Sequence, residues 1–272
     1  MRKITGLIMV VIALFFLFLI GKGLFSLPKT NGQLAEAVFI EDGIVRPENE
    51  GKLVIVMSSL DVASNAYDDE LGLSLPSPVA IRFVEEFAVT GEKDDWQKTW
   101  NPVSESSKDW LKRKSILGEA AMGEFSVSER LLRCFPAGRE LSLSQLDPDE
   151  VAALEEYVRA TVSDGVLYFT EAPDACFYSG PADEFYFDYE GLRRVHYRYL
   201  DLDPDDTFAV AGIQQGNQIA WADDLDTHPV YEDAHSKADV ILQTNLYTIL
   251  GMLLVGIVCV ALLFIGVWWL KE

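Results

Sequence analysis

Alternating carboxylates give the chain its nearest likeness to a metal site. Asp201, Asp203 and Asp205 stand as at the start of a calcium-binding loop, in which such oxygens bind the cation. The positions at which that loop needs Gly and Glu carry Asp206 and Gly212 instead. We therefore interpret this segment as a solvated turn.

The histidines do not stand at metal-ligand spacing either. His228 and His235 flank Glu232 and Asp233, whereas zinc sites use tight pairs such as HExxH. No P-loop, GxGxxG or GxSxG motif occurs in the sequence. The sequence thus predicts no metal site, no cofactor and no catalytic residue, and we expect a protein that is not an enzyme.

The cysteines leave one pairing open. Cys134 and Cys176 could form a disulfide in an oxidising compartment, but the sequence does not show that they are close. Either thiol could form a nucleophilic pair with His196, but only if the two side chains lie within hydrogen-bond distance, which the sequence does not show. Cys259 lies in an apolar block and is expected to be a small apolar residue. Cys134 and Cys176 are therefore a candidate disulfide and nothing more.

Aromatic residues are dense between Tyr168 and Tyr199. Most are expected to lie in the core or in cross-strand pairs. The remainder could form a binding face for a protein or a glycan. The candidate residues for that face are Tyr186, Tyr189, Tyr197 and Tyr199.

Most segments around these residues are typical of β-strands. Residues 79–89 carry apolar side chains at period two, including Val79, Ile81 and Phe83, with an irregularity at Glu85 and Glu86. Further strands are expected at 53–57, 123–127, 166–169, 185–187, 191–202, 207–213 and 218–221.

One helix is clearly marked. Asp147 can cap a helix whose first residue is Pro148, and an apolar stripe then runs to Val162. Gly165 ends this pattern. The central region is therefore expected to be an α+β, strand-rich domain.

Two segments of this domain echo each other. Gly51 to Val62 and Gly191 to Leu202 share a glycine turn, an apolar strand and a Leu-Asp-apolar exit. The echo could mark two related β modules or two ordinary hairpins, and we prefer the hairpins.

An uncharged apolar block lies near each end of the 272-residue chain. About 20 apolar residues span a bilayer, so residues 4–24 and 246–270 are predicted transmembrane helices. A cleaved signal peptide is the rival interpretation of the first block, and a buried core helix that of the second. The glycines of the second block do not form GxxxG, so they give no dimerisation signal.

Two spans place both termini on one side of a membrane. Arg2 and Lys3 favour the cytoplasmic side for residues 1–3, and residues 271–272 would lie there as well. Residues 28–243 would then form a large periplasmic or lumenal domain.

The net charge of −21 limits the partners of that domain. Such a surface repels nucleic acid and anionic lipid headgroups, and it favours basic partners or cations. It would equally serve only to keep a tethered domain solvated.

A series of short motifs follows one order along the chain. They are Glu48–Val54, Leu75-Pro76, Ile81–Glu85, Trp100, Gly123-x-Phe125-x-Val127-Ser128, Leu141–Ser144, Phe177-Tyr178, Gly191–Val195 and Gly216–Ile219. In this order, behind an N-terminal span, they resemble the transmembrane protein 43 (LUMA) family. The resemblance covers nearly all of the central domain.

This resemblance implies a function without implying a catalytic residue. Members of that family have one N-terminal span, a large lumenal domain and usually several C-terminal spans, whereas this sequence shows one. They are associated with the endoplasmic reticulum and inner nuclear membrane, and a prokaryotic relative would lie in the bacterial inner membrane. The resemblance implies a non-enzymatic scaffold that organises other membrane proteins or envelope structure, and a homo-oligomer is left open. The alternative is a periplasmic or lumenal ligand-binding or sensing module.

Overall fold

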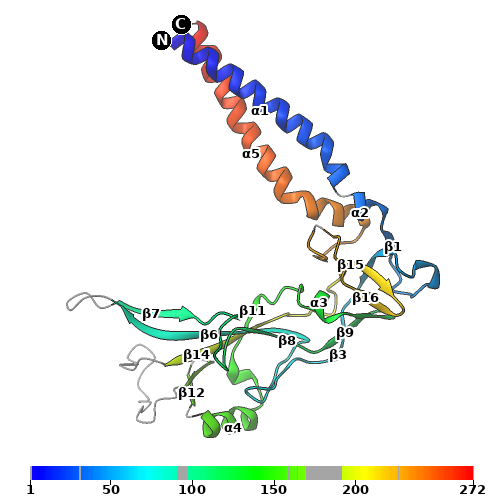
Figure 1. Cartoon of the computed structure of the whole chain (residues 1–272), viewed down its shortest axis with the longest axis vertical. Helices are drawn as coiled ribbons and strands as arrows, with labels where there is room; N and C mark the ends of the chain where they lie inside the picture. Colours follow the sequence, from blue (N-terminus) through cyan, green and yellow to red (C-terminus); the bar gives the residue numbers. More distant parts are fainter. Residues whose placement is uncertain are drawn as a thin grey trace.

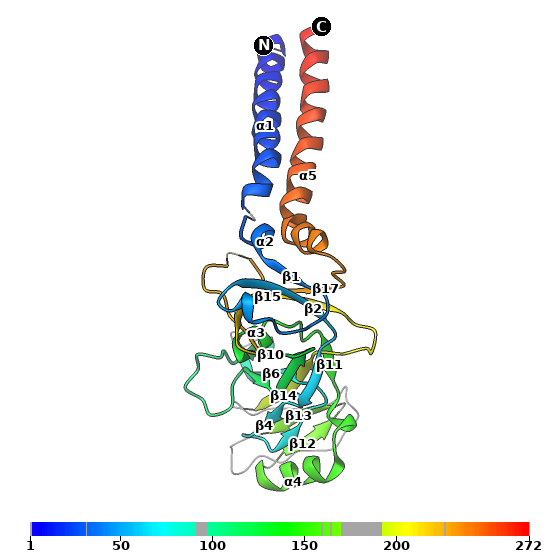
Figure 2. The same cartoon turned by 90° about the vertical axis from the view of Figure 1, so that its right-hand side faces the viewer.

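The computed structural model describes residues 2–30, 32–90, 97–158, 160–163, 165–169, 192–225 and 227–271. Two long helices stand on a domain built of β-sheets, and both termini lie at the far end of the helix pair (Figures 1 and 2). The architecture is therefore mixed α+β, with a strand-rich core between two terminal apolar helices, as the sequence predicted.

The terminal helices are α1 (Arg2–Thr30) and α5 (Lys237–Lys271), which run antiparallel (Figure 1). Each holds a stretch long and apolar enough to cross a membrane, Lys3–Lys22 in α1 and Ile249–Lys271 in α5. Many large apolar side chains on both helices are exposed. Such a helix suits lipid because its backbone groups are already hydrogen-bonded within the helix.

Small residues form the contact between the two helices. Gly6 and Ala13 are buried in α1, and Cys259 and Gly266 are buried in α5. A Cβ built on Gly6 would lie 2.8 Å from the carbonyl oxygen of Gly266, so the backbones approach closely there. The spacing of glycines within one helix could not reveal this contact, because its two sides come from opposite ends of the chain.

The sheet nearer the helices has eight strands. Its main path is β1 (Val38–Ile40), β2 (Leu53–Ser58), β15 (Phe208–Gln215), β16 (Gln218–Ala220), β10 (Phe125–Val127), β9 (Glu119–Met122) and β3 (Asp61–Ser64), and β17 (Val230–Glu232) pairs with β15. Val210 of β15 packs into one apolar core, whereas Ala209 and Ala211 pack into another with α2 (Gly32–Glu36) and the start of α5. This sheet is therefore covered on both faces.

The sheet farther from the helices has seven strands. Its path is β12 (Ala160–Ser163), β13 (Val166–Phe169), β14 (Arg193–Tyr199), β6 (Val79–Thr90) and β7 (Gln97–Pro102), with β11 (Arg139–Leu141) beside β14 and β8 (Lys114–Leu117) beside β6. The elements that supply its inner core are α4 (Pro148–Val158), η2 (Leu143–Gln145) and the hairpin of β4 (Tyr67–Asp68) and β5 (Leu73–Ser74). The remaining elements are η1 (Pro47–Asn49) and α3 (Glu129–Leu132).

The predicted helix is shorter than its apolar stripe. The Asp147 carboxylate accepts the backbone N–H of Asp149 at 2.9 Å, which confirms the cap. The helix ends at Val158, and Val162 belongs instead to β12, which pairs with β13 across a turn at Gly165 (φ 75°). The turn at Gly165 reverses the chain, and residues 160–163 can then pair with β13.

The two echoing segments do not form equivalent structures. The strand after Gly51 is β2, which pairs parallel with β1 and antiparallel with β15. The strand after Gly191 is β14, which lies in the other sheet between two antiparallel strands. Neither strand pairs with the next one along the chain, so both the repeated module and the hairpins were wrong interpretations. The expected strand 185–187 lies outside the described residues.

Candidate interaction site

The two described tyrosines of the predicted interaction face, Tyr197 and Tyr199, lie on strand β14 and point into the core. Tyr197 is fully buried, and its hydroxyl donates to a carboxylate oxygen of Asp68 at 2.8 Å. Tyr199 is partly buried against the same core. Tyr197 therefore cannot belong to an exposed interaction face, and Tyr186 and Tyr189 lie outside the described residues. Successive strand residues point to opposite faces, so burying these tyrosines turns their neighbours outward.

The buried face of the neighbouring strand β6 carries a charge. Arg82 is fully buried, and its Nη1 donates to both carboxylate oxygens of Asp68 at 2.8 Å. Burial lowers the pKa of Arg82, but Asp68 and Glu70 outweigh that effect and raise it above the ordinary value. Burial and the Asp68 charge likewise raise the pKa of Tyr197 well above normal. Near neutral pH Arg82 is therefore charged and the Tyr197 hydroxyl keeps its proton.

The rim of this charge cluster fastens the β4–β5 hairpin. Glu70 accepts from Arg82 and, at 3.1 Å, from Lys114, while Lys114 also donates to Asp69 at 2.8 Å. Burial raises the pKa of Glu70, but the hydrogen bonds from Arg82 and Lys114 outweigh it and lower the pKa below normal. These groups bind one another, so the cluster joins a hairpin to a sheet and leaves little to act on a substrate.

The outer face of the far sheet gathers cations around aromatic rings. We call it the arginine–aromatic face, and it consists of Phe83, Trp100, Arg113, Arg194, His196 and Arg198. The Phe83 ring lies between several cationic side chains, with the Arg113 guanidinium 5.0 Å and the Arg198 guanidinium 5.5 Å from its centroid. His196 stacks on the same ring at 5.2 Å and 6°. Arg194 lies 4.5 Å from the Trp100 centroid. These contacts hold planar cations in fixed places.

Few carboxylates oppose these cations. Arg194 bonds to Glu85 at 2.6 Å, and the exposed Arg198 bonds to the exposed Glu140 at 3.1 Å. Burial lowers the pKa of His196. The charge of Glu85 opposes this effect, and the charges of the neighbouring arginines add to it. His196 is therefore neutral at pH 7, and the face keeps a positive surplus from its arginines.

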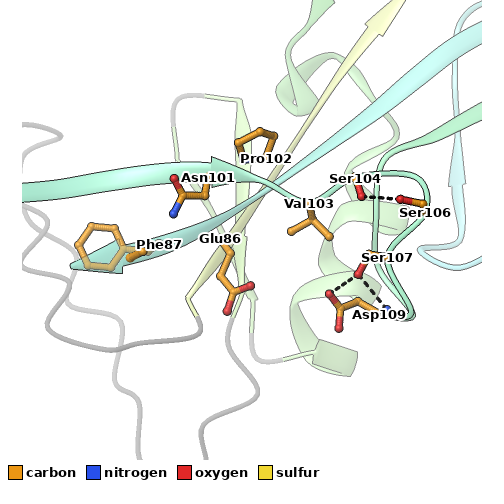
Figure 3. A pocket seen from close by; sticks show the side chains of 10 residues that line it. Glu86, Phe87, Asn101, Pro102, Val103, Ser104, Ser106, Ser107 and Asp109 are labelled. Atoms are coloured by element: carbon orange, nitrogen blue, oxygen red, sulfur yellow. Dashed lines mark hydrogen bonds between the residues drawn. The ribbon is translucent and has the colours of Figure 1, made fainter. Parts of the chain in front are cut away.

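A polar pocket lies at the edge of the same sheet (Figure 3). It has a volume of about 510 Å³ and is lined by Glu86, Phe87, Ala88, Asn101, Pro102, Val103, Ser104, Ser106, Ser107 and Asp109. Arg193 lies 3.5 Å from the Asp109 carboxylate and 3.9 Å from that of Glu86. A hydrogen bond from Ser107 and the charge of Arg193 lower the pKa of Asp109. The pocket is mainly polar, and Phe87 and Val103 add apolar side chains to its lining.

The predicted disulfide remains a prediction. Cys134 has a free thiol, 3.6 Å from the carbonyl oxygen of Arg130, and burial raises the pKa of that thiol. Cys176 lies outside the described residues. His196 stacks on Phe83 in the far sheet, whereas Cys134 follows α3 and packs against the core of the near sheet. The alternative of a Cys134–His196 nucleophilic pair is therefore wrong.

The alternating aspartates behave as a turn. Asp201 bonds to Arg139, and the backbone N–H of Asp203 donates to Asp206 at 2.8 Å. In the described part of the chain no group of three or more His, Cys, Asp or Glu could hold a metal ion. The Nδ1 atom of His228 lies 3.0 Å from the backbone oxygen of Val230.

Sequence reasoning missed the arginine–aromatic face although part of its signal was present. Arg194, His196 and Arg198 occupy every second position of a strand and so had to share one face. Phe83 and Trp100 come from distant segments, and only the pairing of β14 with β6 and of β6 with β7 joins them.

Comparison with models of known families, with curated proteins and with solved structures finds no match to this chain. The resemblance to the transmembrane protein 43 family therefore stays a prediction from the ordered motifs of the sequence.

Proposed function

We propose that this protein is a membrane-anchored, non-enzymatic scaffold of the transmembrane protein 43 type, which organises other membrane proteins. The observation that carries the proposal is the pair of antiparallel apolar helices that supports one strand-rich domain (Figures 1 and 2). In this arrangement both helices cross the bilayer, and the cations Arg2, Lys3 and Lys271 mark the cytoplasmic side. The domain lies in the periplasm or in a lumen.

The join between helices and domain supports a scaffold role. Leu34 of α2 and Val240 of α5 pack with Tyr231 in the apolar core that joins the helices to the near sheet. The Lys237 ammonium donates to the carbonyl oxygens of Ala35 and Ala37, which ties the start of α5 to the end of α2. A domain fixed to both helices in this way holds a bound partner at a defined height and orientation above the membrane.

The helix hairpin can be tested by cross-linking. Ala13 and Cys259 are both buried on the helix seam, whereas Leu14 is exposed. In a variant with Cys134→Ser and Cys176→Ser, Ala13→Cys should form an intramolecular disulfide with Cys259 under mild oxidation in native membranes. Leu14→Cys is the matched control and should not. Equal cross-linking of the two, or none of either, would contradict the hairpin.

The scaffold role needs a separate experiment. Full-length protein would be purified from gently solubilised native membranes, and its companions would be identified by mass spectrometry. We expect a reproducible set of membrane proteins that is lost when residues 28–243 are deleted. A protein that is always recovered alone would refute the scaffold.

A second candidate function is the sensing of a small polar ligand. The pocket of Figure 3 favours it, since Asn101, Ser106 and Asp109 in its lining offer both donors and acceptors. A thermal-shift screen of the full-length protein against polar metabolites would test it. A ligand that stabilises the wild type but not Asn101→Ala would support sensing, and its absence from a broad screen would count against it.

A further inference from the structure

The arginine–aromatic face has the opposite sign to the molecule that carries it. The chain has 43 acidic and 22 basic residues, so an unselected patch of its surface should be acidic. This face instead presents Arg113, Arg194 and Arg198 against Glu85 and Glu140. A local reversal of sign on a strongly charged surface is the pattern of electrostatic complementarity to a partner.

The ion pairs of this face leave its cations available. The Arg198–Glu140 pair is solvent-exposed on both sides, and such pairs contribute little and exchange readily. Arg113 is exposed and, among the described residues, has no carboxylate within ion-pair distance. Its contact is the Phe83 ring, which orders the guanidinium without neutralising it. Arg113 is therefore ordered and uncompensated, and Arg198 has an exposed partner, so these two lose little entropy on binding a carboxylate. A carboxylate on Arg194 would share that cation with the partly buried Glu85.

The spacing of the cations fits an extended ligand. Arg194 and Arg198 lie on one face of β14, about 13 Å apart at about 3.3 Å per residue. An extended chain with an acidic residue at every second position repeats its carboxylates about every 6.6 Å, so two of them reach both arginines. Phe83 and His196 between the arginines offer a flat, partly apolar surface for the intervening residues.

The place of the face decides between anionic partners. The far sheet lies at the end of the domain away from the helix pair, so a lipid headgroup at the helices' membrane cannot reach it (Figures 1 and 2). The net charge of −21 repels the continuous phosphate backbone of a nucleic acid. A short acidic stretch of a polypeptide carries fewer charges than a phosphate backbone, so it meets less of this repulsion, and its carrier can extend to the far end of the domain.

We propose that the arginine–aromatic face binds an extended acidic segment of a partner protein, with acidic residues at alternate positions. This inference rests on the proposed scaffold function and names the chemistry of its partner. The segment lies across β14 and β6, with its carboxylates on Arg113, Arg194 and Arg198 and its backbone over Phe83.

The test measures a probe peptide on full-length protein in nanodiscs. A fluorescent peptide of alternating Glu and Ser is titrated at low and at physiological salt, with an alternating Lys and Ser peptide as the opposite-charge probe. The face variant is Arg113→Glu with Arg198→Glu. The matched control is Arg130→Glu with Arg133→Glu, because both arginines are exposed and Arg130 also stacks on an aromatic ring, Trp221, at 4.3 Å.

We expect saturable, salt-sensitive binding of the acidic peptide by the wild type and the control, and a loss of about tenfold or more in the face variant. No saturable binding by the wild type, or an equal loss in the control, would overturn the proposal. Circular dichroism checks folding, and Arg113→Gln with Arg198→Gln replaces a face variant that fails to fold.

Co-purification separates this inference from the scaffold role. Partners that are retained by the face variant after its peptide binding is lost would overturn the inference while the scaffold stands. Loss of partners from the face variant alone supports both. A wild type without partners refutes the scaffold, whatever the peptide shows.

Discussion

The two sheets of the domain differ in how their faces are covered. The near sheet has apolar cores on both faces, and Val210 and Ala211 of β15 are each fully buried on opposite sides. Among the described residues the far sheet has a core on one face only, with Arg82 inside that core, and the arginine–aromatic face lies on the other side. The near sheet thus packs against the helices, whereas the second face of the far sheet carries charged and aromatic side chains in place of an apolar core in the part of the chain that the structure describes.

The difference extends to how each interior is held. The near sheet depends on close packing of small and branched residues, as at Gly212, where a Cβ would lie 2.5 Å from the Ala220 carbonyl oxygen. The far sheet instead encloses a buried ion pair between Arg82 and Asp68. A buried charge without its partner is far more costly than a lost apolar contact of similar size.

Removal of Arg82 should have the largest effect on stability. Arg82→Ala leaves Asp68 buried without its counter-ion and should lower the free energy of unfolding by about 3–5 kcal/mol. Arg198→Ala changes an exposed arginine of the adjacent strand and should cost at most about 1 kcal/mol. Chemical denaturation of the full-length protein measures both. Similar costs would show that the buried pair is not what holds the far sheet.

A methyl group at Gly212 should perturb the near sheet next most. Gly212→Ala places a Cβ against Ala220 and Leu131 and should cost about 1–3 kcal/mol through strain. Gly138→Ala is the control, because nothing lies within 4 Å of its Cβ, and it should be neutral or stabilising. Melting temperatures measure both changes, and an unchanged value for Gly212→Ala would mean that β15 packs less closely against β16 and α3 than described.

The Tyr197 hydroxyl should contribute less than the arginine. Tyr197→Phe removes one hydrogen bond to Asp68 and should cost about 1–2 kcal/mol, since Arg82 still binds the carboxylate. Tyr199→Phe, on the same strand, should change stability by about 0.5 kcal/mol at most. If the tyrosine face of the sequence prediction were exposed, both changes would be equally mild.

His196 should give the smallest effect, visible as a dependence on pH. Its pKa in the folded protein is below the ordinary value of about 6.5, so the unfolded chain binds more protons just below that pH. The resulting stabilisation is complete above about pH 6.5 and is lost as the pH falls toward the folded pKa. His196→Gln should remove this part of the acid dependence, measured as the difference between the two denaturation profiles. Identical profiles would mean that His196 titrates normally.

The prediction of the fold was best where one local pattern decided the structure. The apolar run of β2 could only be a buried strand, and the Asp147 cap fixed where α4 begins. It was poorest where the pattern had two solutions. Arg194 and Tyr197 alternate along β14, and both side chains have a long apolar part and a polar end, so either face could have been buried.

The candidate site shows the same division. Its β14 residues lie on one face by strand geometry alone, and the sequence contained that much. Which face is exposed depended on Asp68, a residue of a short hairpin that pairs with Arg82 and Tyr197 in the folded core. A long-range ion pair leaves no periodic trace in the sequence, so no local pattern could have predicted it.

By itself the sequence determined two apolar terminal helices, a strand-rich acidic region between them and the absence of familiar catalytic motifs, because composition and periodicity are local properties. Only the tertiary structure decided that Gly6 meets Gly266, that Arg82 is buried and that Arg194, His196 and Arg198 face outward. Those outcomes depend on which distant segments pair, and the free energy of pairing comes from contacts that exist only in the folded chain.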